Sequence, residues 1–192
     1  MKRVLKISIV FVMTIFMLKS YCQSWNGIPI SGTFASLKTN MLSKGFRLIK
    51  KEGSSAYFEG SINGVNYEVV SYCTPISNQV ANLSIYLPIK ETWSAIKSEY
   101  KYIKELIIEK YGEPEQYEYF SSPYYEGDGY EMSAVVGEKC VFSAFWLNIR
   151  NEPNLSIMTE ISKYKQVQIN YQNNENIKKA TQEKDALNKK VF

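Results

Sequence analysis

Two amphipathic helical segments, each followed by a run of short strands, constrain the fold of this chain more than any other sequence feature. Apolar residues fall at helical spacing over residues 33–44 and again over about 92–111. Glycine follows each segment, at Gly45 and Gly112, where it is expected to end the helix. Strands that follow a helix as a run, without further helices between them, are typical of an antiparallel α+β protein.

The strands are predicted from alternating apolar and polar residues. Asn63-Gly64 is the strongest short signal for a two-residue hairpin, and it joins two such stretches, 56–62 and 65–73. Further strands are expected at 81–87, near 131–136, and at 139–149, 155–161 and 167–171. We therefore predict a two-layer α+β fold of two successive helix-then-antiparallel-meander halves. Its order is a helix, three strands, a helix, four strands and a terminal helix.

The N-terminal 22 residues have the composition of a signal peptide. Basic residues precede an apolar-rich run over 7–18, which is shorter than the ~20 residues that span a bilayer. Cleavage after Cys22 would leave Gln23 as the new N-terminus. The alternatives are a lipoprotein acylated on Cys22 and an uncleaved anchor.

Each of these alternatives places the folded part outside the cytoplasm, in the periplasm or secreted. We expect residues 1–22 to be the signal peptide and 23–172 to be a single α+β domain. Residues 173–192 form a Lys-rich C-terminal tail with a marginal helix. No transmembrane span is expected after signal cleavage.

The chain without its first 22 residues has no net charge. Lys and Arg total 23 and Asp and Glu total 19, and four of the basic residues lie within residues 1–22. A nucleic-acid-binding domain normally carries a net basic surface, so nucleic acid is not expected as a partner. The chain has no histidine, which excludes Ser-His-Asp and Cys-His nucleophiles and His-ligated metal sites. We expect no cofactor and no metal centre.

Two cysteines, Cys73 and Cys140, follow the predicted cleavage position. Both fall in strand-like stretches, and disulfides persist outside the cytoplasm, so a disulfide between them is one expectation. Two separate buried thiols are the other expectation, because free cysteine packs as a small apolar residue.

The stretch from Glu113 to Glu131 is the densest in residues with functional chemistry, since it combines acids with aromatic side chains. Pro123, Gly127 and Gly129 predict a loop in its middle. Tyrosine supplies large rigid contact area at a low entropic cost, so the loop is a candidate surface for an envelope protein or a glycan. The candidate binding residues are Tyr117, Tyr119, Tyr124, Tyr125, Glu126, Asp128 and Tyr130. The alternative is a long connection whose tyrosines pack over a sheet edge while its acids stay solvated.

These features favour a non-catalytic binding module, and no catalytic residue is assigned. A carboxylate-dependent glycan hydrolase is an alternative, since glycosidases need two carboxylates and no histidine. Its pair would come from Glu113, Glu118, Glu126 and Asp128. Glu126 and Asp128 alone fall short of the six to eight oxygen ligands that Ca²⁺ takes. A structural envelope component is a third interpretation, favoured if Cys22 is acylated.

Several short motifs occur in an order that resembles one protein family. They are Gly27-Ile28-Pro29-Ile30-Ser31-Gly32, Lys44-Gly45-Phe46, Tyr57-Phe58-Glu59-Gly60, the helix from Trp93 to Tyr100, Lys110-Tyr111-Gly112-Glu113-Pro114 and Val167-Gln168-Ile169-Asn170-Tyr171. Over residues 27–172 the set is similar to a family of uncharacterised small exported proteins common in gut-dwelling Gram-negative anaerobes. The resemblance implies export and a single domain, and it transfers no site. The order of helices and meanders also resembles, at the level of fold alone, β-lactamase-inhibitor-like periplasmic modules.

Overall fold

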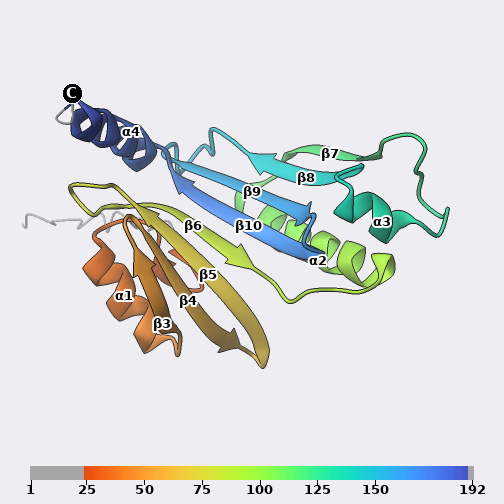
Figure 1. Ribbon diagram of the computed structural model, residues 1–192, viewed down its shortest axis with the longest axis horizontal. Coiled ribbons are helices and arrows are strands. Elements are labelled where there is room, and N and C mark those ends of the chain that lie inside the picture. The colour runs from red at the N-terminus through yellow and green to blue at the C-terminus, as the bar shows by residue number, and fades with distance from the viewer. Residues whose placement is uncertain (1–23, 190–192) are drawn as a thin grey trace, which may run out of the picture.

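The computed structural model describes residues 24–189, and the predicted signal peptide with Cys22 lies outside them. Its centre is an eight-stranded antiparallel sheet with the strand order β3-β4-β5-β6-β10-β9-β8-β7 (Figure 1). The predicted α+β class is confirmed. Within residues 24–189, no helix combines the length and the apolar character needed to cross a membrane.

The first half of the sheet follows a short hairpin. That hairpin pairs β1 (Ser24–Trp25) with β2 (Ile28–Pro29). Helix α1 (Phe34–Ser43) precedes β3 (Arg47–Glu52), β4 (Ser55–Ile62), β5 (Val65–Cys73) and β6 (Val80–Tyr86). Thr33 caps α1 by accepting a hydrogen bond from the Ser36 amide at 3.3 Å. The predicted hairpin is confirmed: Asn63 and Gly64 connect β4 to β5 with positive φ angles of 52° and 79°.

The second half repeats the sequence of a helix and four strands, with one short helix inserted. Helix α2 (Trp93–Tyr111) precedes β7 (Glu115–Phe120), α3 (Glu131–Val136), β8 (Cys140–Trp146), β9 (Leu155–Ser162) and β10 (Gln166–Asn173). Thr92 caps α2, and Gly112 follows it with a φ of 84°. The two meanders meet where β6 pairs with β10.

Besides the short β1–β2 hairpin, which the sequence did not predict, the layout differs from the prediction at three elements. The strand predicted near 131–136 is wrong, since these residues form α3. A short apolar run suits a buried helical turn as well as a strand, and Ala134 and Val135 are buried here. The strands β3 and β7 were not predicted, because both lie at an edge of the sheet and their side chains are mostly exposed.

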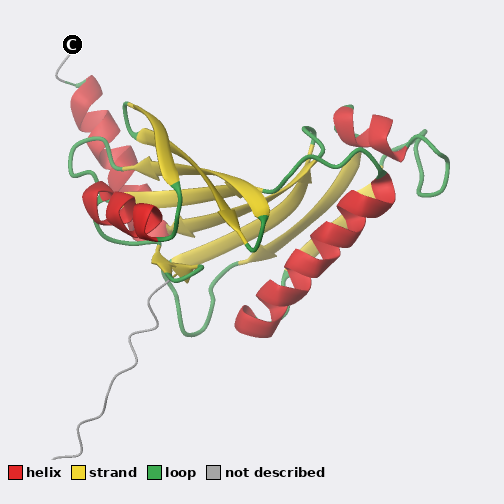
Figure 2. Cartoon of the chain, turned by 90° about the horizontal axis from the view of Figure 1, so that it is seen from below, coloured by secondary structure: helices red, strands yellow, loops and turns green. Residues whose placement is uncertain are grey.

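The helices α1 and α2 pack on the same face of the sheet. Phe34 of α1 contacts Phe58 of β4, with ring centroids 6.5 Å apart, and Tyr100 of α2 contacts Phe142 of β8 at 5.9 Å. The strand register places Phe58 and Phe142 on one face, which holds the main core. In Figure 2, α2 lies below the strands.

The Lys-rich tail contains a helix that docks on the sheet. Helix α4 (Asn174–Asn188) places the Glu183 carboxylate against the turn between β5 and β6. That carboxylate accepts hydrogen bonds from the Ile76 amide at 2.7 Å and from the Ser77 hydroxyl at 2.6 Å. Asn176 donates to the Val80 carbonyl at 2.6 Å. The tail helix is therefore held by specific contacts at its first and third turns.

The structure contains no disulfide between Cys73 and Cys140, so that expectation is wrong. Both cysteines are free and buried. Cys73 ends β5 and Cys140 begins β8, and the strands β6, β10 and β9 lie between them. Four strand spacings of about 4.8 Å place the two chains roughly 19 Å apart, far beyond the Cα separation of a disulfide. The alternative of two buried thiols describes the structure.

Candidate binding surface

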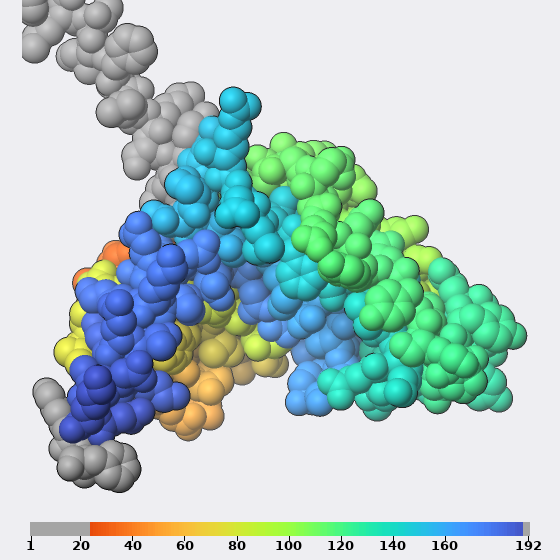
Figure 3. All heavy atoms as spheres, turned by 90° about the horizontal axis from the view of Figure 1, so that it is seen from above, coloured from red at the N-terminus to blue at the C-terminus, as the bar shows by residue number. Residues whose placement is uncertain are grey.

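The face of the sheet opposite α1 and α2, which we call the open face, is the largest candidate site. It is concave: in Figure 3 the molecular outline recedes between the β3–β4 region (orange to olive) and α3 (teal). At the α3 end of this hollow lies a depression of about 340 Å³, lined by Val135 of α3 together with Ser143, Glu160 and Gln168. A concave surface of this kind can receive a convex partner.

One row of side chains crosses the open face from edge to edge. The register aligns one residue from each strand, and we call this set the central row. Its members, in strand order, are Arg47, Glu59, Glu68, Tyr86, Gln168, Glu160, Ser143 and Tyr117. Residues that pair across neighbouring strands lie close enough to contact one another. All eight side chains are polar or aromatic, in contrast to the apolar face beneath the helices.

Two carboxylates of the central row have no cationic partner. Arg47 donates to Glu59 at 2.8 Å, which neutralises that pair. Glu68 and Glu160 form no salt bridge or hydrogen bond through their side chains among residues 24–189. Burial raises the pKa of the Glu160 carboxyl above its usual range. Burial also raises the pKa of the Tyr86 hydroxyl, and the charges of Glu160 and Glu68 raise it further. The centre of the open face therefore holds two carboxyl groups, Glu68 and Glu160, that no cation of residues 24–189 neutralises.

The predicted binding residues divide between two places. Tyr117 and Tyr119 lie on β7 and face the open side, where Tyr117 pairs with Ser143 and Tyr119 with Val141. Tyr125 and Tyr130 lie in the loop over residues 121–130, with exposed fractions of 64% and 65%. Tyr124, in contrast, packs against the hydrophobic core. The seven residues thus do not form one surface.

The two acids of the predicted set hold the loop in place. Glu126 accepts hydrogen bonds from the Trp93 indole at 3.1 Å and from Lys97, both at the start of α2. These donors lower the pKa of the Glu126 carboxyl. Asp128 accepts from the amides of Tyr125 at 3.0 Å and Tyr130 at 2.7 Å. Each carboxylate therefore has a structural role within the loop.

Two of the acids considered for a hydrolase, Glu118 and Glu126, are each bound to a different lysine of α2. Glu118 lies under α2 and binds Lys104, whereas Glu126 binds Lys97, and these lysines are seven residues apart on the helix. At 1.5 Å per residue their backbones are separated by about 10 Å along the helix axis. Within residues 24–189, no group of three or more His, Cys, Asp or Glu side chains is placed to hold a metal ion.

Most of the central row was not identified from the sequence. The pattern that marks it is the alternation within single strands, most clearly in β10, where Gln166, Gln168, Asn170 and Gln172 all occupy one face. A strand with amides at every outward position indicates a face that is neither core nor charged surface. The alignment of these residues with Tyr86 and Glu68 depends on strand order, which the local pattern does not contain.

Comparisons with known proteins identify no relative: no protein-family model, no curated protein and no solved structure matches this chain.

Proposed function

We propose that this protein is an exported, non-catalytic binding module that holds a protein of the cell envelope on the open face of its sheet. The observation that carries the proposal is the central row, which places polar and aromatic side chains across all eight strands. Tyrosines give rigid contact area, and amides and hydroxyls give adaptable hydrogen bonds. Tyr117 and Tyr119 belong to this surface, so part of the set predicted from the sequence is retained.

The dimensions of the open face favour a protein over a small ligand. Seven strand spacings of about 4.8 Å and strands of about seven residues give a face of roughly 34 by 23 Å. The resulting area, close to 800 Å², is what one partner contributes to a standard protein–protein interface. Because Glu68 and Glu160 lack cations, the complementary partner surface carries basic residues.

Site-specific photo-crosslinking in native envelopes tests this proposal. We expect a photoreactive amino acid in place of Ser84, on the open face of β6, to give one defined protein adduct. The same amino acid in place of Glu105, which is exposed on α2, gives none. Combining Glu68→Lys with Glu160→Gln removes the adduct. The matched control, Glu105→Lys with Glu109→Gln, makes the same charge changes on α2 and retains the adduct.

The loop over residues 121–130 is the competing contact surface, since Tyr125 and Tyr130 project from it. Photoreactive substitutions at these two positions distinguish the surfaces. An adduct from the loop without an adduct from Ser84 overturns the assignment to the open face. Adducts from neither surface overturn the proposal of a binding module.

Export is the second part of the proposal, and the composition of residues 1–22 supports it. The intact mass of the protein purified from its native envelope tests it. A chain beginning at Gln23 supports cleavage and a periplasmic or secreted module. A lipid-modified Cys22 supports a membrane-attached structural component instead, and a full-length cytoplasmic chain contradicts export.

A further inference from the structure

The sheet divides into two branches where β5 leaves β6. The ladder between these strands runs from the Glu68–Tyr86 pair to the Cys73–Val80 pair. Residues 65–67 of β5 extend beyond it, towards the hairpin tip at Asn63-Gly64. After Tyr86 the chain stays with β10, since the Leu87 amide donates to the Val167 carbonyl at 3.0 Å and the Lys90 amide to the Lys165 carbonyl at 2.9 Å. Figure 1 shows β4 and β5 diverging from β6 at this point.

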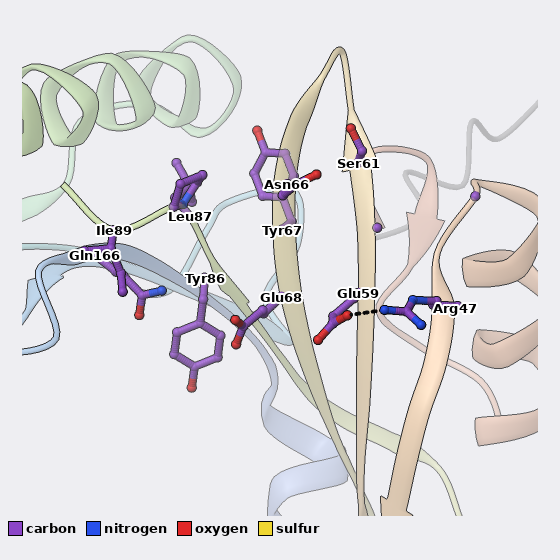
Figure 4. Close-up of a pocket in the computed structure, with 13 residues that line it drawn as sticks. Arg47, Glu59, Ser61, Asn66, Tyr67, Glu68, Tyr86, Leu87, Ile89 and Gln166 are labelled. Carbon is purple, nitrogen blue, oxygen red and sulfur yellow. Dashed lines mark hydrogen bonds and ion pairs between the residues drawn. The ribbon is translucent and has the colours of Figure 1, made fainter.

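A pocket of about 580 Å³ lies in this division, which we call the fork pocket. Its volume is within the range of pockets that bind small organic molecules, roughly 300–1,000 Å³. The lining comes from both faces of the sheet, with Glu68 and Tyr86 from the open face and Tyr67 from the helix face. In Figure 4, Tyr67 and Tyr86 point to opposite sides of the strands. The fork pocket therefore lies in the gap that the diverging strands leave in the sheet.

One side of the fork pocket is apolar. Leu87, Pro88 and Ile89, which lead from β6 towards α2, line it opposite the β4–β5 hairpin. Ile89 is 55% exposed, so its side chain is accessible to a ligand in the pocket. This wall and the Tyr67 ring give an apolar body a surface on which to pack.

The polar side of the fork pocket carries one uncompensated negative charge. The Arg47–Glu59 ion pair lies at its edge and adds no net charge, which leaves Glu68 as the free carboxylate (Figure 4). Burial, followed by the charge of Glu99, raises the pKa of Tyr67, and the Tyr86 hydroxyl responds likewise to Glu160 and Glu68. On the helix face Glu99 is paired with Lys90 at 2.9 Å, so the uncompensated charge that a ligand meets is the Glu68 carboxylate on the open face.

We infer that the fork pocket binds a small organic cation, namely a primary amine attached to an apolar body. The ammonium pairs with Glu68 and lies near the Tyr86 ring, and the apolar body packs on Pro88 and Ile89. This site overlaps the proposed protein contact, because Arg47, Glu59, Glu68 and Tyr86 of the central row also line the fork pocket. The amine belongs either to a free metabolite or to a lysine of a docked partner, and the same chemistry serves both.

A titration followed by amide NMR tests the inference with defined probes. Phenethylamine is the cation, 2-phenylethanol its neutral isostere and phenylacetate an anion. We expect saturable shifts at residues 66–68 and 86–89, with phenethylamine binding about five-fold more tightly than the alcohol and phenylacetate not binding, as one partly exposed charge pair allows. Glu68→Gln abolishes the preference for the amine, whereas the matched control Glu109→Gln, exposed on α2, keeps it.

Two further measurements distinguish the two sources of the amine and check that the variants are folded. Tighter binding of Nα-acetyl-lysinamide than of phenethylamine assigns the site to a partner's lysine, and the reverse order assigns it to a free amine. Thermal melts confirm that the variants are folded. Equal affinities for amine and alcohol, retention of the preference in Glu68→Gln, or shifts away from the fork overturn the inference. The titration uses small probes and the crosslinking is read at Ser84, so a failed titration with a retained Ser84 adduct overturns the fork pocket alone, and loss of the adduct with a normal titration overturns the protein contact alone.

Discussion

Lys104 of α2 lies beneath the helix with its ammonium bound to the carboxylate of Glu118 on β7. Lys104 is only 8% exposed, and it also donates to the Gln116 side chain at 2.8 Å. Glu118 points inward from the last strand of the sheet. A charge that points inward from an edge strand discourages the addition of another strand, because pairing would bury it further.

Removal of one member of this pair should destabilise the fold. We expect Lys104→Met to lower the free energy of unfolding by about 2 kcal/mol, since Glu118 would remain partly buried without its cation. Adding Glu118→Leu should restore most of the loss, because two apolar side chains leave no charge unpaired. Urea unfolding of the single and double variants measures both values. A double variant less stable than Lys104→Met would contradict this account.

Tyr124 and Tyr125 are neighbours with opposite environments, so their variants should behave differently. Tyr124→Ser removes a ring packed against the core and is expected to cost about 2 kcal/mol. Tyr125→Ser removes an exposed ring and should change stability by less than about 0.5 kcal/mol. Thermal melts of the two variants provide the measurement. Equal losses would show that the loop packs differently from this structure.

The two thiols should be unreactive in the native protein. Burial raises the pKa of the Cys140 thiol to about 12 and raises that of Cys73 as well. At pH 8 a thiol reagent should therefore label neither cysteine until denaturant is added, and then label both. The intact mass should not change on reduction. A gain of about 2 Da on reduction would instead demonstrate a disulfide.

Glu152 should make stability depend on pH. Its side chain is 6% exposed, one carboxyl oxygen has no hydrogen-bond partner among the described residues, and burial raises its pKa while Lys110 opposes the shift. The folded state therefore favours the protonated form. The stability that Glu152 contributes is complete below the usual carboxyl pKa and is lost as the pH rises through the raised value.

Glu152→Gln isolates this effect, because the amide is neutral at every pH. We expect the variant to be about 1 kcal/mol more stable than the native protein at pH 7 and equal to it near pH 3. Urea unfolding at both pH values tests the difference. A variant that is less stable at pH 7 would indicate that the carboxylate has a favourable partner in solution.

The predicted elements that the structure confirms are those with a strong local period. The α2 segment carries an apolar residue at each helical turn, a capping threonine and a terminal glycine, so its limits follow from neighbouring residues. The β4–β5 hairpin likewise follows from Asn63-Gly64. The edge strands β3 and β7 carry no such period, because exposed positions on both faces tolerate charges.

The candidate site, like the fold, was only partly predictable from local sequence. The aromatic and acidic character of residues 117–130 is evident in the sequence. In the structure, however, Tyr117 lies on the open face, whereas the Glu126 carboxylate accepts a hydrogen bond from Trp93 of α2. Tyr117 and Glu126 are nine positions apart, and their separation arises from the turn that ends β7. Composition identified the residue types, and only the fold distinguished contact residues from those that hold the loop.

By itself the sequence determined the α+β class, the helices α1 and α2, the β4–β5 hairpin and the neutral, histidine-free chemistry of residues 23–192. The tertiary structure decided the order of the strands, and with it the central row and the fork pocket. The Ser84 hydroxyl, for example, lies 2.6 Å from the Asn170 side chain although 86 residues separate them. Periodicity reports which face of a strand is buried, because that depends on nearby residues. Strand order depends on contacts between distant segments, which local patterns do not encode.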